Sequence, residues 1–184
     1  NPANLMLLPL HVVLLELIID PTCSIVLERQ AAENDIMNRK PRNPKEKILT
    51  SGILIKSILQ GMVIFAMSFG TYYIFLQQNN NAFLARTMGL VVIILSNLLL
   101  VQVNSSNTRF VFQSLKVLIK DRVMWIVSIG TIFGLLIILY TPLSSFLKLA
   151  PLSIIQFFMA VGIAAAAVLW YEIIKFIKFL SKKK

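Results

Sequence analysis

The stretch from Leu5 to Leu27 reads LMLLPLHVVLLELIIDPTCSIVL, and it decides the class of fold. A hydrocarbon core about 30 Å thick is crossed by about 20 helical residues, and this stretch is apolar almost throughout. It nevertheless carries two carboxylates near its middle, Glu16 and Asp20. Ionised groups at that depth cost roughly 2.5–3.5 kcal/mol each on insertion scales, so they are rarely present without a role. The stretch therefore predicts a membrane-spanning helix that carries a functional site.

The rest of the chain repeats this pattern of long apolar runs. Apolar residues make up 57% of the sequence and charged residues 14%, with a mean hydropathy of +0.78. Such a composition is typical of integral membrane proteins. We therefore predict an all-α, polytopic membrane protein, a bundle of five transmembrane helices. The predicted spans are about 5–27, 51–76, 83–103, 123–141 and 151–180, the last opened by Pro151 in its first turn.

The basic residues predict how the chain is oriented. Six Lys/Arg residues lie in 28–50, four in 104–122 and five at the C-terminal end, against one in each of the other two connections. Loops rich in Lys and Arg face the cytoplasm, so we expect a multi-pass protein of the cell membrane with its N-terminus outside and its C-terminus cytoplasmic. This distribution also excludes nucleic-acid binding as the reason for the net charge of +10. The lysine tail is expected to contact the lipid bilayer.

Glu16 and Asp20 are four residues apart, so both fall on one face of a helix. Two anions this close in a low dielectric persist only if a cation lies between them or a proton neutralises one. Pro21 has no amide proton and should kink or unwind the helix, freeing carbonyl oxygens as ligands. Such hard oxygen donors suit calcium, magnesium, manganese or sodium. We therefore predict an ion or proton pathway, with a structural hydrogen-bonded network between helices as the alternative.

Other polar and small residues in the spans are less specific. Asn97 is a lone amide in the third span, equally typical of a ligand and of a contact between helices. His11 is off the face of Glu16 and is expected to be a packing residue. Gly130 and Gly134 form a GxxxG pattern that favours close helix approach, as does the small-residue patch 162–167.

A longer segment carries a family resemblance. LELIIDPTCSIVLERQAAENDIMNRKPRNPKEKIL, which starts at Leu15, resembles the sixth transmembrane helix and following cytoplasmic loop of P-type cation-transporting ATPases of the calcium-pump class. Its most specific part is DIMNRKPRNPKE, Asp35 to Glu46, which matches the family's run Asp-Ile-Met-x-Arg-x-Pro-Arg-x-Pro without a gap. The resemblance continues to the end of the chain. It implies that the five spans are the sixth to tenth helices of a ten-helix transport domain, in agreement with the odd number of spans and the exterior start, which already indicate a part of a longer protein.

The resemblance also implies roles for particular residues. Two-site calcium pumps carry Asn-x-x-Thr-Asp in the sixth helix, where this chain has Glu16, Ile19 and Asp20. Asp20 is thus implied as a cation ligand, Glu16 as a ligand of changed type, and Ile19 as the loss of a hydroxyl ligand typical of single-site members. Asn97 occupies a position where two-site pumps have a glutamate, so it is a weaker implied ligand. Calcium is the implied cargo, with manganese, sodium or protons as alternatives.

The remaining implications concern the rest of the pump. The chain has no Asp-Lys-Thr-Gly-Thr phosphorylation sequence, so we predict no catalytic residue in it. ATP hydrolysis with Mg²⁺ would belong to the full-length protein, whose other transmembrane helices and cytoplasmic domains are the implied partners. The loop residues Asp35, Arg39, Pro41 and Arg42 would couple the membrane site to the phosphorylation domain.

Two alternatives from other classes stay open at this point. The chain could be a complete secondary transporter or channel subunit whose acids relay protons without ATP. It could also be a membrane scaffold in which the two acids are only structural.

Overall fold

The computed structural model describes residues 5–28, 51–104 and 122–182 as helices and their connections. Five helices are long and apolar enough to cross a membrane, which confirms the predicted all-α, polytopic fold. The helices are α1 (Pro9–Glu28), α2 (Ser51–Asn79), α3 (Ala82–Asn104), α5 (Arg122–Tyr140), the short α6 (Leu143–Phe146) and α7 (Ile154–Lys182).

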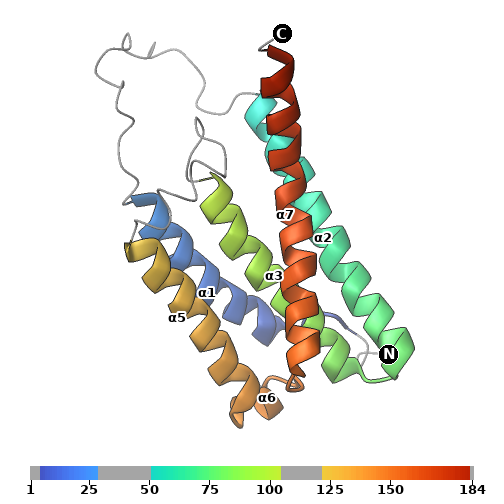
Figure 1. Cartoon of the computed structure of the whole chain (residues 1–184). Coiled ribbons are helices and arrows are strands. Elements are labelled where there is room, and N and C mark those ends of the chain that lie inside the picture. Colours follow the sequence, from blue (N-terminus) through green and yellow to red (C-terminus); the bar gives the residue numbers. More distant parts are fainter. Residues whose placement is uncertain (1–4, 29–50, 105–121, 183–184) are drawn as a thin grey trace.

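Helix α3 is the centre of the bundle. It contacts the other four long helices, while α2 also packs on α7, and α1 also packs on α5 (Figure 1). Figure 1 shows α6 at one end of the bundle, the end where α2 ends and α3 and α7 begin. We call this the α6 end. Two pairs of helices therefore flank α3, and α1 belongs to the pair that lies with α5.

The core surrounds the first half of α3, where every residue from Ala85 to Val92 is buried. A helix that is apolar on all sides is stable only when neighbours cover it all round. Leu135 and Leu139 of α5 and Ala160 and Ala164 of α7 complete this cluster. The alanines, each fully buried, let α7 approach α3 closely. Ala164 belongs to the predicted small-residue patch 162–167 and has the predicted packing role, whereas Gly162 of that patch is exposed.

Two helices begin later than the sequence predicted, each at a residue that favours a helix start. Helix α1 begins at Pro9, because proline lacks the amide proton that a first helical residue leaves unpaired. Helix α7 follows Ser153, whose Oγ accepts from the Gln156 N–H at 3.3 Å while the Ser153 N–H donates to Gln156 Oε1 at 2.9 Å. This reciprocal pair is a capping box, so the prediction that Pro151 lies in the first turn is wrong.

Polar side chains join α3 to its neighbours at several levels. The Ser68 hydroxyl of α2 donates to the Gly89 carbonyl at 2.8 Å, and Gln102 of α3 donates to Ser128 of α5 at 2.8 Å. At the end opposite α6, Lys56 Nζ donates to Asn104 Oδ1 at 2.9 Å and lies 4.9 Å from the centre of the Tyr171 ring. Lys56 therefore binds within the bundle instead of only extending toward the membrane surface.

Glycine contacts differ from the prediction based on the GxxxG pattern. A Cβ added at Gly89 would lie 2.7 Å from Met6 Cε and 3.3 Å from Tyr72 Cβ, so this glycine permits a close approach of α2 to α3. At Gly130 and Gly134 an added Cβ would meet no atom within 4 Å among the described residues. Among the glycines of the described helices, the close contact is therefore at Gly89, and Gly130 and Gly134 of α5 meet no other described helix.

Candidate functional site

Helix α1 has one buried face and one exposed face. His11, Thr22 and Val26 are buried against the bundle. Because successive residues turn by about 100° around a helix, Glu16 and Asp20 lie about 120–180° around the axis from His11 and Thr22. Both acids are exposed. The carboxylates therefore point away from the helices that this chain supplies.

The two acids lie on the same exposed face, as the four-residue spacing predicted, but they stand alone there. Among the side chains that the structure describes in residues 5–28, 51–104 and 122–171, neither carboxylate forms an ion pair or hydrogen bond. The same residues contain no group of three or more His, Cys, Asp or Glu side chains close enough to hold a metal ion. The described residues thus supply a pair of exposed carboxylates and no complete ion site.

The helix does not unwind at Pro21. Helix α1 continues from Pro9 to Glu28 with Pro21 inside it, so the predicted break is corrected to one missing backbone hydrogen bond. The turns on both sides retain their bonds, and proline is tolerated in membrane helices for this reason. The Thr22 hydroxyl also donates to the Ile18 carbonyl at 2.6 Å. Since Pro21 has no N–H, the Leu17 carbonyl lacks its intrahelical donor, and this oxygen lies one residue after Glu16 in the sequence.

Asn97 is separate from the acid pair in this structure. Its side chain is half-buried in α3, and its amide donates to the Ile93 carbonyl of the same helix at 3.0 Å. No hydrogen bond between Asn97 and an α1 carboxylate occurs in the described part of the chain. The side-chain oxygen of Asn97 is the atom that remains able to accept or to bind a cation. Asp35, Arg39, Pro41 and Arg42 lie outside the described residues.

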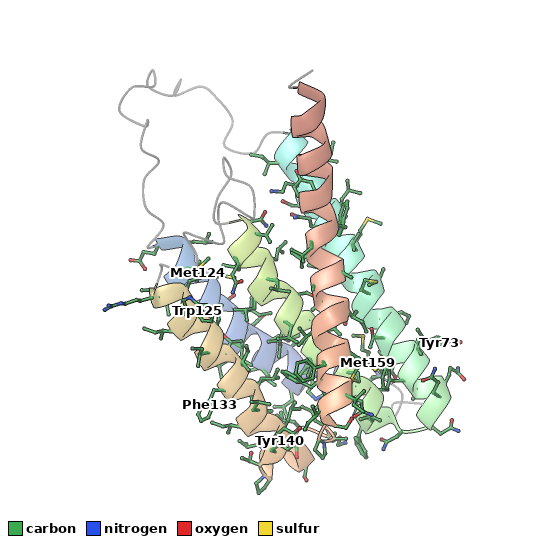
Figure 2. The ribbon with its side chains drawn as sticks, in the orientation of Figure 1. Tyr73, Met124, Trp125, Phe133, Tyr140 and Met159 are labelled. Atoms are coloured by element: carbon green, nitrogen blue, oxygen red, sulfur yellow. The ribbon has the colours of Figure 1, made fainter. Side chains whose placement is uncertain are left out.

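Helix α5, which packs against the buried face of α1, has an exposed apolar face of its own. Trp125, Ile129 and Phe133 are each at least half exposed, and Figure 2 shows Phe133 on the outer side of α5. The two helices touch through Thr22 and Thr131, whose hydroxyl oxygens are 3.4 Å apart. Carboxylates on one helix and apolar side chains on the next offer a further helix or lipid both a polar and an apolar surface.

The sequence reasoning missed one buried cation. Arg86, near the start of α3, is only 2% exposed. Its Nε and Nη2 donate to the Leu5 carbonyl at 3.1 and 3.0 Å, and its Nη1 donates to the Lys148 carbonyl at 3.1 Å. The sequence feature that could have indicated a buried Arg86 is its position directly before a long run of mostly apolar residues. Carbonyl partners far away in the chain leave no mark on the sequence.

Comparisons with known proteins agree with this architecture. The family described as "Cation transporting ATPase, C-terminus" matches residues 4–177. Calcium-transporting ATPase type 2C member 1 of Homo sapiens is 26% identical over 179 residues, 95% of this chain and 18% of that protein. The proteins of the same name from Pongo abelii and Mus musculus are 25% identical over the same shares. The chain thus spans about a fifth of the length of these relatives. With a match over nearly its whole length and five membrane-type helices, the chain belongs to the family of C-terminal membrane regions of cation-transporting P-type ATPases.

Proposed function

We propose that this chain is the C-terminal transport region of an ATP-driven calcium pump and that Glu16 and Asp20 are its cation ligands. One observation carries the proposal. The two carboxylates lie on the one face of α1 that no described helix covers. Carboxylates at membrane depth need a cation, a proton or a polar partner, and in this proposal helices elsewhere in the pump complete their shell.

Calcium is the proposed cargo because the similar proteins are named calcium-transporting ATPases and because carboxylate and carbonyl oxygens suit this ion. Ile19 offers no oxygen donor in the turn between the acids, so we propose one cation per transport cycle. Asn97 is proposed as a further cation ligand whose side-chain oxygen reaches the ion only in a conformation of the pump other than this one. ATP and Mg²⁺ act at domains beyond this chain, and 28–50, with Asp35, Arg39, Pro41 and Arg42, is proposed as the coupling loop.

The proposed orientation has the α6 end outside the cytoplasm and the lysine-rich ends inside, since basic loops are retained on the cytoplasmic side. In this orientation calcium reaches the acids from the cytoplasm and leaves toward the α6 end, and protons take its place on the carboxylates.

The test is calcium uptake into sealed membrane vesicles that contain the full-length protein. The proposal expects uptake that requires Mg²⁺ and ATP, and loss of uptake in Asp20→Asn at equal protein levels. Arg122→Gln is the matched control, because it also removes one charge and Arg122 is exposed at the start of α5, away from the two acids and the proposed coupling loop. Ion flux without ATP would instead support a secondary transporter, and unchanged uptake in Asp20→Asn would contradict the ligand assignment.

A further inference from the structure

A group of polar contacts at the α6 end joins three segments that are far apart in the sequence. The segment 5–8 precedes α1, α3 begins nearby, and the turn 147–150 links α6 to α7. His11, Arg86 and Thr87 bind the backbone of the first and third segments. We call this group of side chains and carbonyls the clasp.

His11 bridges the start of α1 to the turn after α6. Its side chain is fully buried. The Leu8 N–H donates to His11 Nδ1 at 3.1 Å, and His11 Nε2 lies 2.6 Å from the Leu147 carbonyl oxygen. A carbonyl only accepts, so Nε2 carries the proton, and Nδ1 accepts with its lone pair. Both ring nitrogens are therefore used in structural bonds, and His11 has no lone pair left for a cation.

Arg86 and Thr87 hold the same two segments from α3. The guanidinium of Arg86 donates twice to the Leu5 carbonyl and once to the Lys148 carbonyl. The Thr87 Oγ1 accepts from the Ala150 N–H at 2.9 Å. The planar guanidinium has its donors in a fixed fork, which sets direction as well as distance. Lys148 itself has a φ of 53°, a left-handed conformation that bends the turn at this contact.

The clasp constrains how α1 is rotated about its own axis. Leu5 is held just before the helix and His11 in its first turn, and a continuous helix transmits that rotation to its later residues. Glu16 lies about 7.5 Å and Asp20 about 13.5 Å along the axis from His11, at 1.5 Å per residue. Farther along α1, the polar contact with α5 is the Thr22 to Thr131 pair at 3.4 Å, which is longer and weaker. The hydrogen bonds that act on the rotation of α1 are therefore concentrated at the α6 end, while Leu14, Leu15 and Ile18 pack the helix against the core.

We infer that His11 and Arg86 are positioning residues for the cation site: the clasp fixes the rotation of α1 and so the direction of the Glu16 and Asp20 carboxylates. This inference rests on the proposed role of the two acids as ligands. A buried guanidinium loses its hydration, and the hydrogen bonds to the Leu5 and Lys148 carbonyls offset that loss. What Arg86 adds is geometry, because its fork joins the segment before α1 to the turn after α6.

The experiment is equilibrium binding of radioactive calcium to the purified full-length protein, which separates the dissociation constant from the number of sites per protein. Arg86→Lys and His11→Phe should raise the dissociation constant about tenfold, as does loss of an outer partner that orients a metal ligand, while the number of sites stays unchanged. His11→Gln should restore binding to within about twofold of wild type, because its amide N–H can replace Nε2–H. Lys56→Met is the control, since the Lys56 to Asn104 contact lies at the opposite end and does not involve α1.

A purely structural role predicts the reverse pattern, with fewer sites per protein at an unchanged dissociation constant, and that result would overturn the inference. If Arg86→Lys does not accumulate, Thr87→Val can be used instead, because it removes only the hydrogen bond from the Ala150 N–H. Its calcium dissociation constant should also rise, but by less than about tenfold. Asp20→Asn measured alongside separates the two proposals. Unchanged binding in Asp20→Asn defeats the proposed function, whereas a loss in Asp20→Asn together with wild-type constants in the clasp variants defeats only the positioning role.

Discussion

His11 and the pair Glu16 and Asp20 lie on one helix and are treated in opposite ways by the fold. His11 is fully buried, and both ring nitrogens have partners within this chain. The two acids, about one and a half and two and a half turns farther on, are exposed and have no partner among the described residues. A buried polar group needs hydrogen bonds from its surroundings, and the described residues supply them on one side of α1 only. Under the proposed function the acid face is an incomplete ion site, whereas the clasp is complete within the described residues.

Removing Arg86 disrupts the clasp and should have the largest effect on the stability of the protein. Arg86→Ala leaves the Leu5 and Lys148 carbonyls without their donor and opens a cavity, at an expected cost on the order of 3 kcal/mol. The measurement is thermal unfolding of the purified full-length protein in mild detergent. Arg122→Ala is the matched control, because Arg122 is exposed at the start of α5 and should change stability by less than about 0.5 kcal/mol. Equal melting temperatures for the two variants would contradict the clasp.

A substitution at Glu16 tests whether the exposed acid face of α1 binds calcium or only stabilises the fold. Glu16→Gln keeps an oxygen donor but removes a charge, so the calcium dissociation constant should rise about tenfold, equivalent to about 1.4 kcal/mol. Thermal stability should not fall, since no partner in the described chain is lost. Calcium binding and melting are measured on the same preparation. A large loss of stability with unchanged binding would favour the structural network over the ion site.

Glycine substitutions compare the two sides of the bundle. Gly89→Ala should destabilise by about 1 kcal/mol, because the new methyl group meets Tyr72 and the Ser68 carbonyl in a tight contact. Gly130→Ala meets no described atom within 4 Å and should stabilise α5 by roughly 0.5–1 kcal/mol through helix propensity. Both are measured by thermal unfolding of the full-length protein. Destabilisation by Gly130→Ala would assign the GxxxG face to a contact with a part of the pump outside this chain.

The smallest effect is expected at Lys56. Lys56→Met loses the hydrogen bond to Asn104 and the contact with the Tyr171 ring but keeps an apolar stem of similar length, so the expected cost is about 0.5 kcal/mol. Lys148→Met is the comparison, because the Lys148 side chain is exposed and only its carbonyl joins the clasp. Its melting temperature should equal that of wild type. A larger effect for Lys148→Met than for Lys56→Met would mean that the exposed ammonium group takes part in the clasp.

The helices and the shared face of the acids followed from the sequence because both depend on local periodicity. Long apolar runs predict spans, and a spacing of four places Glu16 and Asp20 together. The start of α7 was missed by three residues because the proline at 151 was preferred over the capping box of Ser153 and Gln156. That box was readable in the sequence and is the stronger local signal.

The clasp could not be predicted in the same way. Arg86 binds carbonyls 81 and 62 residues away, and His11 reaches one that is 136 residues away. Every residue has a carbonyl, so partners of this kind carry no side-chain signature. The close approach at Gly89 has the same explanation, since a single glycine within an apolar run indicates no partner, whereas the GxxxG pattern indicates a small-residue face without showing what covers it.

The most direct test of the account is the affinity of the full-length protein for calcium after Asp20→Asn. If the exposed face of α1 is half of an ion site, equilibrium binding should show a dissociation constant raised at least about 100-fold through the lost ligand charge, with Arg122→Gln unchanged and the protein folded normally. A dissociation constant equal to that of wild type in Asp20→Asn would contradict the central claim.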